Sequence, residues 1–155
     1  MVNLNFQGVE PIRTDPATAR AFVLDPQQVG RCLPDLQELQ VADSRHFVAY
    51  VKVGVGPVRG RFRLDVALDP GEGSDGAGLS LTGSGMGSGL SLTSRLRFEP
   101  SGEGTNLVWE ARAAVSGPLA TVGGRLLEGQ ARKVIEQLFR SIRQELEVAR
   151  DRAGG

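Results

Sequence analysis

Few side chains in this sequence could take part directly in a chemical reaction. His46 is the only histidine and Cys32 the only cysteine. A general base or a nucleophile needs a partner that activates it, and the sequence places no serine, cysteine or aspartate partner beside His46. Nothing near Cys32 would stabilise a thiolate, so we expect this residue to be a small buried filler. The sequence therefore predicts no catalytic residues.

Metal and nucleotide sites are equally poorly supported. The carboxylates do not cluster at ligand spacing, and one cysteine can form neither a zinc site of several cysteines nor an internal disulfide. The segment GEGSDG (residues 71–76) matches G-x-G-x-x-G literally, but that motif works only when a helix follows it. Here the next segment, AGLSLTGSG, alternates like a strand. We therefore interpret residues 71–76 as a hairpin loop and predict no metal and no nucleotide.

Composition narrows the class of protein. The 155 residues fit one domain, and 18 basic side chains balance 18 acidic ones. This balance favours neither nucleic acid nor an anionic membrane as a partner. No apolar run approaches the roughly 20 residues that span a bilayer, and no signal peptide is visible. A cytoplasmic location is therefore the expectation.

Alternation with a period of two dominates the middle of the chain. After a first strand at the N-terminus, apolar and polar residues alternate between residues 36 and 115, interrupted by turn signals such as Gly56-Pro57 and Ser101-Gly102. This pattern predicts an antiparallel meander of six or seven strands with one dry face. The segment VKVGVGPVRGRFR (residues 51–63) is interpreted as a hairpin corner rather than a phosphate-binding loop, because a strand follows its glycines.

Helical signals flank the meander. Asp15-Pro16 and Asp25-Pro26 predict two short helices over about residues 16–23 and 26–32. A stripe of Leu119, Val122, Leu126, Val134, Leu138, Ile142 and Leu146 predicts one long helix from roughly 119 to 149 that covers the concave face of the sheet. The fold class is α+β. Residues 1–150 form a single domain and residues 151–155 a polar tail.

The glycines of the meander have two interpretations. Gly83 and Gly85 lie in the predicted strand LSLTGSGMG (residues 79–87), where glycine costs stability. They could mark bends of a curled sheet. They could also leave an inward-facing hollow beneath the long helix, open to a ligand.

Three stretches resemble one family. VKVGVGPVRGRF (residues 51–62) and LDPQQVGRCLPDL (residues 24–36) are similar to the family of the carbon monoxide dehydrogenase G subunit, and GGRLLEGQARKVIEQLF (residues 123–139) is a looser match. This family belongs to the START-like, polyketide-cyclase-like (SRPBCC) helix-grip superfamily. The resemblance covers nearly the whole chain. It implies a helix-grip fold, in which a curved antiparallel sheet wraps a long C-terminal helix around an apolar cavity.

The resemblance also implies a function. Family members are thought to act as accessory proteins of molybdenum-containing dehydrogenases, by recruiting the enzyme to the membrane or by binding a quinone. Some carry a hydrophobic C-terminal tail, whereas this sequence ends in the polar ARDRAGG, so we expect at most peripheral membrane contact. The leading hypothesis is non-enzymatic binding of a quinone or lipid-like molecule. The expected cavity residues are Phe62, Leu64, Leu81, Met86, Leu92, Trp109, Val122, Leu126, Val134 and Leu138, although these ten could equally form a filled core.

Two other hypotheses stay open. The protein could be an interaction module that docks onto a molybdenum hydroxylase through Arg59, Arg61 and Arg63, which share one face of a strand. A solvated outer face is the simpler interpretation of the same arginines. The third hypothesis is a cyclase- or hydrolase-like enzyme, since the superfamily includes some, with only His46, Cys32 and scattered carboxylates available to it.

Overall fold

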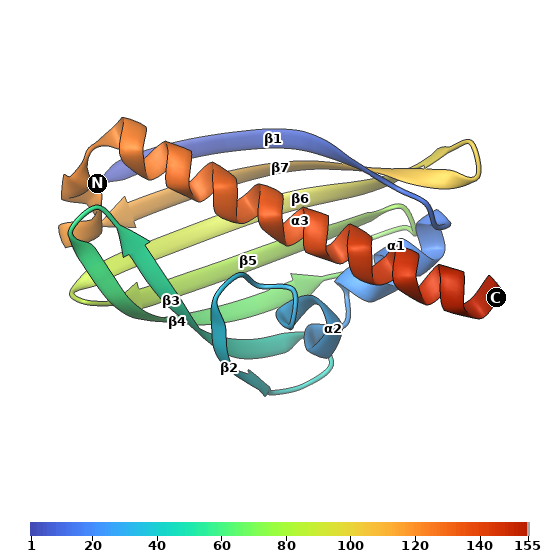
Figure 1. Ribbon diagram of the computed structural model, residues 1–155, viewed down its shortest axis with the longest axis horizontal. Helices are drawn as coiled ribbons and strands as arrows, with labels where there is room; N and C mark the ends of the chain where they lie inside the picture. The colour runs from blue at the N-terminus through green and yellow to red at the C-terminus, as the bar shows by residue number, and fades with distance from the viewer. Residues whose placement is uncertain (155) are drawn as a thin grey trace.

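The computed structural model describes residues 1–154 as one sheet wrapped around a long helix (Figure 1). The elements along the chain are β1 (Val2–Ile12), α1 (Pro16–Val23), α2 (Pro26–Gly30), β2 (Leu36–Val41), β3 (His46–Val55), β4 (Val58–Asp69), β5 (Gly76–Gly85), β6 (Ser88–Ser101), β7 (Gly104–Ser116), the 3-10 helix η1 (Pro118–Val122) and α3 (Gly124–Gly154). This architecture confirms the predicted α+β class, with two short helices after the first strand.

The sheet has seven strands in the order β1-β7-β6-β5-β4-β3-β2, and every neighbouring pair is antiparallel. Strands β2 to β7 follow one another as a meander, while β1 joins the far edge beside β7. The alternation seen in the sequence matches the pleat. In β7, for example, Leu107, Trp109 and Ala111 are buried, and Glu110 and Arg112 are exposed. One face of the sheet therefore forms the core and the other faces solvent.

The segment at residues 51–63 is the hairpin that the sequence predicts. Val55 pairs with Val58, so the connection has two residues, Gly56 and Pro57. Gly56 has a φ of 57°, which a type II′ hairpin turn requires at its first central position and which glycine adopts without a steric cost. A strand follows the glycines, so these residues form no phosphate-binding loop.

The two short helices begin at the aspartates that the sequence marks. The Asp15 carboxylate accepts a hydrogen bond from the Thr18 backbone N–H at 3.0 Å, and the Asp25 carboxylate accepts one from the Gln27 backbone N–H at 3.0 Å. Proline occupies the first helical position in both. The second helix ends at Gly30, two residues earlier than predicted.

The long helix begins later than predicted. Residues 118–122 form η1, and Gly123, with a φ of 104°, separates it from α3. A non-glycine residue rarely adopts this conformation, so the chain changes direction here. The other end of α3 extends to Gly154, so residues 151–154 of the expected polar tail are helical, and Gly155 lies outside the described residues.

The side of α3 that meets the sheet also differs in part from the predicted stripe. Leu127, Phe139, Ile142 and Leu146 are buried, whereas Leu126 is 42% exposed and Val134 is 48% exposed. The predicted stripe was therefore wrong at two of its seven positions. A break at Gly123 cannot be seen in apolar spacing, because the spacing on either side of it still fits a single helix.

The helix packs mainly against β1 and η1, with smaller contacts to α1 and β3. Two ion pairs fasten it to the β1 side: Arg143 to Glu10 at 3.1 Å, and Arg13 to Glu147 at 3.5 Å. Aromatic stacking joins it to β7, since the rings of Trp109 and Phe139 lie 4.9 Å apart. The helix is thus held toward one edge of the sheet.

Candidate functional site

The candidate site is the inner face of the central strands β4, β5 and β6. Side chains alternate along each strand, so all the inward positions of one strand share the face that α3 overlies. Phe62 and Leu64 on β4 are buried at 2% and 7% exposure. On the next two strands Leu96 is also buried, but four other inward leucines are only half-buried; they are Leu79, Leu81, Leu90 and Leu92.

The position of α3 explains this partial burial. The helix packs on β1, and its main contacts do not include β5 or β6. Figure 1 shows α3 crossing the sheet from the η1 end, with the β3–β4 hairpin rising beside its first turns. The leucines of β5 and β6 therefore lie beneath a helix that covers them incompletely.

The side of α3 that faces away from β1 carries an exposed valine, Val134. Arg132 and Arg143 lie on the β1 side, where Arg132 stacks over the Phe6 ring and Arg143 pairs with Glu10. At 100° per residue, Val134 projects roughly 160° away from Arg132. Val134 therefore lies on the side of α3 away from β1, which explains its exposure.

The β3–β4 hairpin forms the opposite boundary. Val53 and Val58 pack half-buried against the core. Leu126 on α3 lies beside the hairpin turn, since a Cβ built on Gly56 would be 3.4 Å from its Cδ2. The side chain of Met86, from the β5–β6 turn, occupies the space over Gly60. Helix, hairpin and sheet thus surround one apolar region.

The ten expected cavity residues fall into three groups. Phe62, Leu64 and Trp109 are buried; Leu81, Met86, Leu92, Val122 and Leu138 are half-buried; Leu126 and Val134 are exposed. Sequence reasoning missed Leu79, Leu90, Ile135 and Phe139, which share the region. Leu79 and Leu90 could have been found, because they continue the alternation of Leu81 and Leu92.

The hollow expected at Gly83 and Gly85 is absent, which corrects one of the two interpretations of these glycines. A Cβ on Gly83 would lie 2.9 Å from Cδ2 of Leu64, and one on Gly85 would collide with the Phe62 ring. Large neighbours on β4 fill the space that the glycines leave. The glycines permit close packing rather than a hollow.

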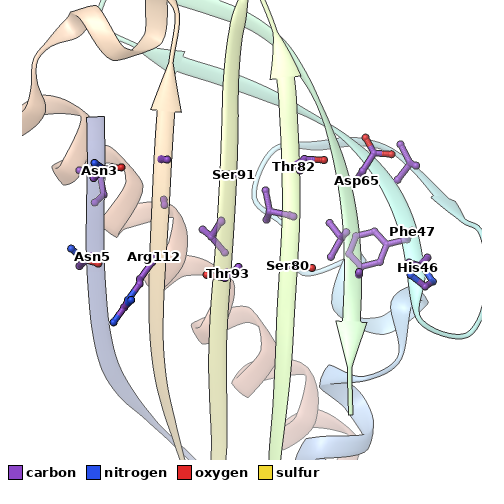
Figure 2. A pocket seen from close by; sticks show the side chains of 18 of the residues that line it. Asn3, Asn5, His46, Phe47, Asp65, Ser80, Thr82, Ser91, Thr93 and Arg112 are labelled. Carbon is purple, nitrogen blue, oxygen red and sulfur yellow. The ribbon is translucent and has the colours of Figure 1, made fainter. Parts of the chain in front are cut away.

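A second feature lies on the opposite, outer face of the sheet. Figure 2 shows a hollow there that extends across the strands, with α3 behind the sheet. Its volume is about 750 Å³. Exposed polar side chains such as Ser80, Thr82, Ser91 and Thr93 line it together with apolar residues, among them Val48, Ala67, Leu81 and Leu92. This hollow lies on the opposite side of the sheet from the inner apolar region and combines polar with apolar side chains.

The comparison with protein families shows to which family the chain belongs. The model of the family described as the G subunit of carbon monoxide dehydrogenase (CoxG) matches residues 8–147. The chain belongs to the CoxG family. Among curated proteins, none matches this sequence.

Solved structures show that this CoxG-family chain has the START-like helix-grip fold. A conserved protein from Geobacillus kaustophilus is similar with a TM-score of 0.84 and 21% identity, over 94% of this chain and 97% of that one. A START superfamily protein from Mycobacterium smegmatis has a TM-score of 0.70 and 13% identity, over 94% and 98%. The Zhui aromatase/cyclase from a Streptomyces species has a TM-score of 0.67 and 12% identity, over 99% of each chain.

Neither His46 nor Cys32 of this CoxG-family protein lies on β4, β5, β6 or α3. His46 begins β3 on the outer face, and an aspartate does lie beside it, contrary to the expectation from the sequence, since its Nδ1 is 2.8 Å from a carboxylate oxygen of Asp43. Cys32 is buried, its Sγ donates to the Gln28 carbonyl oxygen at 3.5 Å, and burial raises the pKa of its thiol to about 11. Within residues 1–154, no three potential metal-binding side chains cluster.

The segment at residues 71–76 lies in the β4–β5 connection, as a hairpin loop should. Arg20 of α1 donates hydrogen bonds to the carbonyl oxygens of Pro70 and Gly76, both at 2.8 Å. The loop leads into β5 and not into a helix. Its literal match to the nucleotide motif therefore has no structural counterpart in this CoxG-family chain.

The three arginines of β4 differ in their partners. Arg61 lies over the Tyr50 ring and 3.7 Å from a Glu38 carboxylate oxygen, and Arg63 pairs with Asp65 at 3.1 Å. Arg59 is exposed and has no ion-pair partner among the described residues. As for membranes, none of the helices in residues 1–154 combines the length and hydropathy that a bilayer span needs.

Proposed function

We propose that this protein binds a hydrophobic small molecule, such as a quinone or a lipid-like compound, between α3 and the inner face of β4–β6. The observation that carries this proposal is the row of half-buried leucines, Leu79, Leu81, Leu90 and Leu92, beneath a helix that packs on the far edge of the sheet. Covering such side chains with an apolar ligand contributes about 25 cal/mol per Å² removed from water.

The polarity of the inner face supports an apolar ligand. The inward positions of β4, β5 and β6 carry no charged side chain, as their alternation with exposed residues shows. The inward hydroxyls are already engaged: Ser94 donates to the Glu110 carbonyl oxygen at 2.8 Å, and Ser88 accepts from the Leu119 N–H at 2.9 Å. Shape and apolar contact, rather than hydrogen bonds, would select the ligand.

Membership of the CoxG family supports the role of an accessory protein for a molybdenum-containing dehydrogenase. The structural neighbours include both a START superfamily protein and an aromatase/cyclase, so the fold alone does not separate binding from catalysis. Neither His46 nor Cys32 lies on β4–β6 or α3, the elements between which the ligand is proposed to bind. We therefore favour binding without chemical change of the ligand.

A matched pair of exposed valines tests the proposal. Val134 lies on the open side of α3, whereas Val9 lies on β1 at 56% exposure and away from the apolar region. Val134→Asp places a charge beside the ligand, so we expect at least a tenfold loss of affinity for menaquinone, while Val9→Asp binds normally. Trp109 fluorescence during titration with menaquinone or a fatty acid reports binding. Native mass spectrometry of the purified protein detects a ligand that co-purifies.

Two results would contradict the proposal. One is that neither class of ligand binds, by fluorescence or as a mass shift. The other is that Val134→Asp and Val9→Asp reduce binding equally, which would place the ligand elsewhere or make the effect nonspecific.

A second candidate function is docking onto the dehydrogenase through Arg59, Arg61 and Arg63. The observation that favours it is that residues 51–64 contain no acidic side chain and that Arg59 lacks an ion-pair partner among the described residues. Arg59→Glu would then abolish co-purification with the enzyme at low salt, where surface charges act most strongly. Arg95→Glu, on the outer side of β6, is the control. Equal retention of the enzyme by both variants would exclude this surface.

A further inference from the structure

The outer hollow is built from two rungs of side chains that run across the strands. In one rung Arg112 of β7 lies opposite Asn5 of β1 and Thr93 of β6, and Thr93 lies opposite Ser80 of β5. In the next rung Ser91 of β6 lies opposite Thr82 of β5. Because opposed residues in a sheet have Cβ atoms about 5 Å apart, these groups form a regular array. Figure 2 shows this arrangement on the solvent side of the sheet.

Charge in the hollow is concentrated on Arg112. Asp65, at one border, is paired with Arg63 at 3.1 Å, and His46 is hydrogen-bonded to Asp43 at 2.8 Å. Within residues 1–154, no carboxylate lies at ion-pair distance from Arg112. Figure 2 shows the Arg112 side chain reaching from β7 toward β1, where Asn5 lies. The hollow therefore presents one uncompensated positive charge, at its β7 side.

The remaining polar groups have unused hydrogen-bonding capacity. Some serine and threonine hydroxyls, such as those of Ser94 and Thr105, form hydrogen bonds with other described residues, but none of these hydroxyls lines the hollow. Those of Ser80, Thr82, Ser91 and Thr93 face the hollow and are exposed. Each can donate one hydrogen bond and accept others. Ala114 beside Arg112 is too short to fill the space above it. The volume of about 750 Å³ exceeds what a single inorganic ion occupies and lies in the range of small-molecule sites.

We propose that this hollow binds a small hydroxylated organic anion, such as a sugar phosphate or a sugar acid. The guanidinium of Arg112 binds the anionic group, with Asn5 and Thr93 on either side of it. Ser80, Thr82 and Ser91 bind the hydroxyl groups of the same molecule. Phosphate and carboxylate share the planar or multidentate acceptor geometry that arginine matches, so both belong to the proposed class.

This site is independent of the apolar region on the inner face. The hydroxyl, amide and guanidinium groups that form it lie on the outer side of the sheet, and α3 contributes none of its lining, although Leu81 and Leu92 of the inner face also border it. A failure to bind the anion would leave the proposed binding of a hydrophobic molecule untouched, and the reverse also holds.

Titrations followed by amide chemical shifts test the proposal, with glucose 6-phosphate and gluconate as the phosphate and carboxylate probes. Glucose and inorganic phosphate are the matched control probes. Glucose has the hydroxyl groups but no anionic group, and inorganic phosphate has the anionic group but no sugar hydroxyls. We expect saturable shifts in β5, β6 and β7 with at least one of the two organic anions. Glucose or inorganic phosphate alone should bind at least tenfold more weakly, because each makes only part of the contacts.

Three variants distinguish binding in the hollow from a general effect of surface charge. Arg112→Met should weaken binding by about tenfold or more, since a charge-assisted contact is lost. Arg95→Met removes a comparable exposed arginine of β6 that does not line the hollow, and should bind normally. Thr93→Val keeps the shape of the side chain and removes a hydroxyl, so it should weaken binding of the organic anion more than that of inorganic phosphate.

Several results would overturn the proposal. These are the absence of saturable binding of both organic anions, equal binding of inorganic phosphate and glucose 6-phosphate, and equal losses in Arg112→Met and Arg95→Met. The variants replace exposed side chains, so each should fold, and the amide spectrum itself reports whether it does.

Discussion

At the scale of single residues, the packing of Trp109 depends on a glycine in the neighbouring strand. Gly8 of β1 is its direct neighbour in the sheet, and a Cβ on Gly8 would lie 2.8 Å from Cε2 of the indole ring. The ring occupies that space and stacks on Phe139 of α3 at 4.9 Å. One glycine thus lets β1, β7 and α3 meet.

Replacing Gly8 by valine should therefore destabilise the protein by roughly 1–3 kcal/mol, because the indole ring must move and lose its stacking. Urea unfolding measures the change. Gly54→Val is the control, since a Cβ there would meet only Cγ of Arg59 at 3.7 Å, an ordinary contact. If both variants have the same stability, the packing of Trp109 does not depend on Gly8.

Cys32 provides a residue-scale prediction about pH. Burial, and to a smaller extent the charge of Glu145, raises the pKa of its thiol from 9.0 to about 11. At pH 8 the native protein should react with Ellman's reagent far more slowly than the urea-unfolded chain. Because the folded-state pKa lies above the unfolded one, the unfolded state loses its proton first, so this group lowers stability as pH rises from about 9 to 11. Rapid reaction of native protein at pH 8 would contradict the burial.

At the scale of elements, the start of α3 decides how open the apolar region is. Gly123 ends η1, and α3 then packs toward β1 rather than across the centre of the sheet. Gly124 and Gly129 lie in its first turns, and a Cβ at either position would meet no neighbouring atom within 4 Å. Packing therefore does not require these glycines.

We accordingly expect Gly129→Ala to stabilise the protein by about 1 kcal/mol, the difference in helix propensity between the two residues. Thermal unfolding measures it. Gly83→Ala is the opposite case, since its methyl group would lie 2.9 Å from Cδ2 of Leu64, and it should destabilise. A stabilised Gly129→Ala variant that binds ligand more slowly would show that this part of α3 moves during entry. A destabilised one would contradict the absence of contacts.

Local patterns predicted most of the elements. The strands follow from alternation, the helix starts from Asp15-Pro16 and Asp25-Pro26, and the hairpin from Gly56-Pro57. The inner-face residues Phe62, Leu81 and Leu92 follow from the same alternation. Residues governed by long-range geometry were harder to predict. The exposure of Leu126 and Val134 depends on the packing of α3 toward β1, and the filling above Gly83 depends on a leucine of a neighbouring strand.

The outer hollow could not be predicted for a similar reason. Asn5, Thr93 and Arg112 are far apart in the sequence and become neighbours only through the register of three strands. Each alone has the pattern of an ordinary solvent-facing strand residue. The sequence marks them as outward, but only the curvature of the sheet brings them around one space.

At the scale of the whole molecule, ligand binding should raise the free energy of unfolding. A ligand that binds only the folded state, at about 100 times its Kd, adds roughly 2.7 kcal/mol. For a domain of this size we expect menaquinone or a fatty acid to raise Tm by roughly 5–10 °C. With a tenfold lower affinity, Val134→Asp should show only about half of this rise at the same ligand concentration. An unchanged wild-type Tm at saturating ligand would contradict binding to the folded state.

The strand order also has a consequence for synthesis. β1 leaves the ribosome first, but its only partner in the sheet is β7, from Val2 opposite Val115 to Ile12 opposite Thr105. Strands β3 to β6 can pair with the preceding strand as each emerges, whereas Leu4 and Phe6 wait unpaired until residues 104–116 have been made. Such an exposed apolar strand is prone to aggregation. A nascent chain arrested before β7 should therefore be retained by chaperones, and its release should coincide with the emergence of residues 104–116.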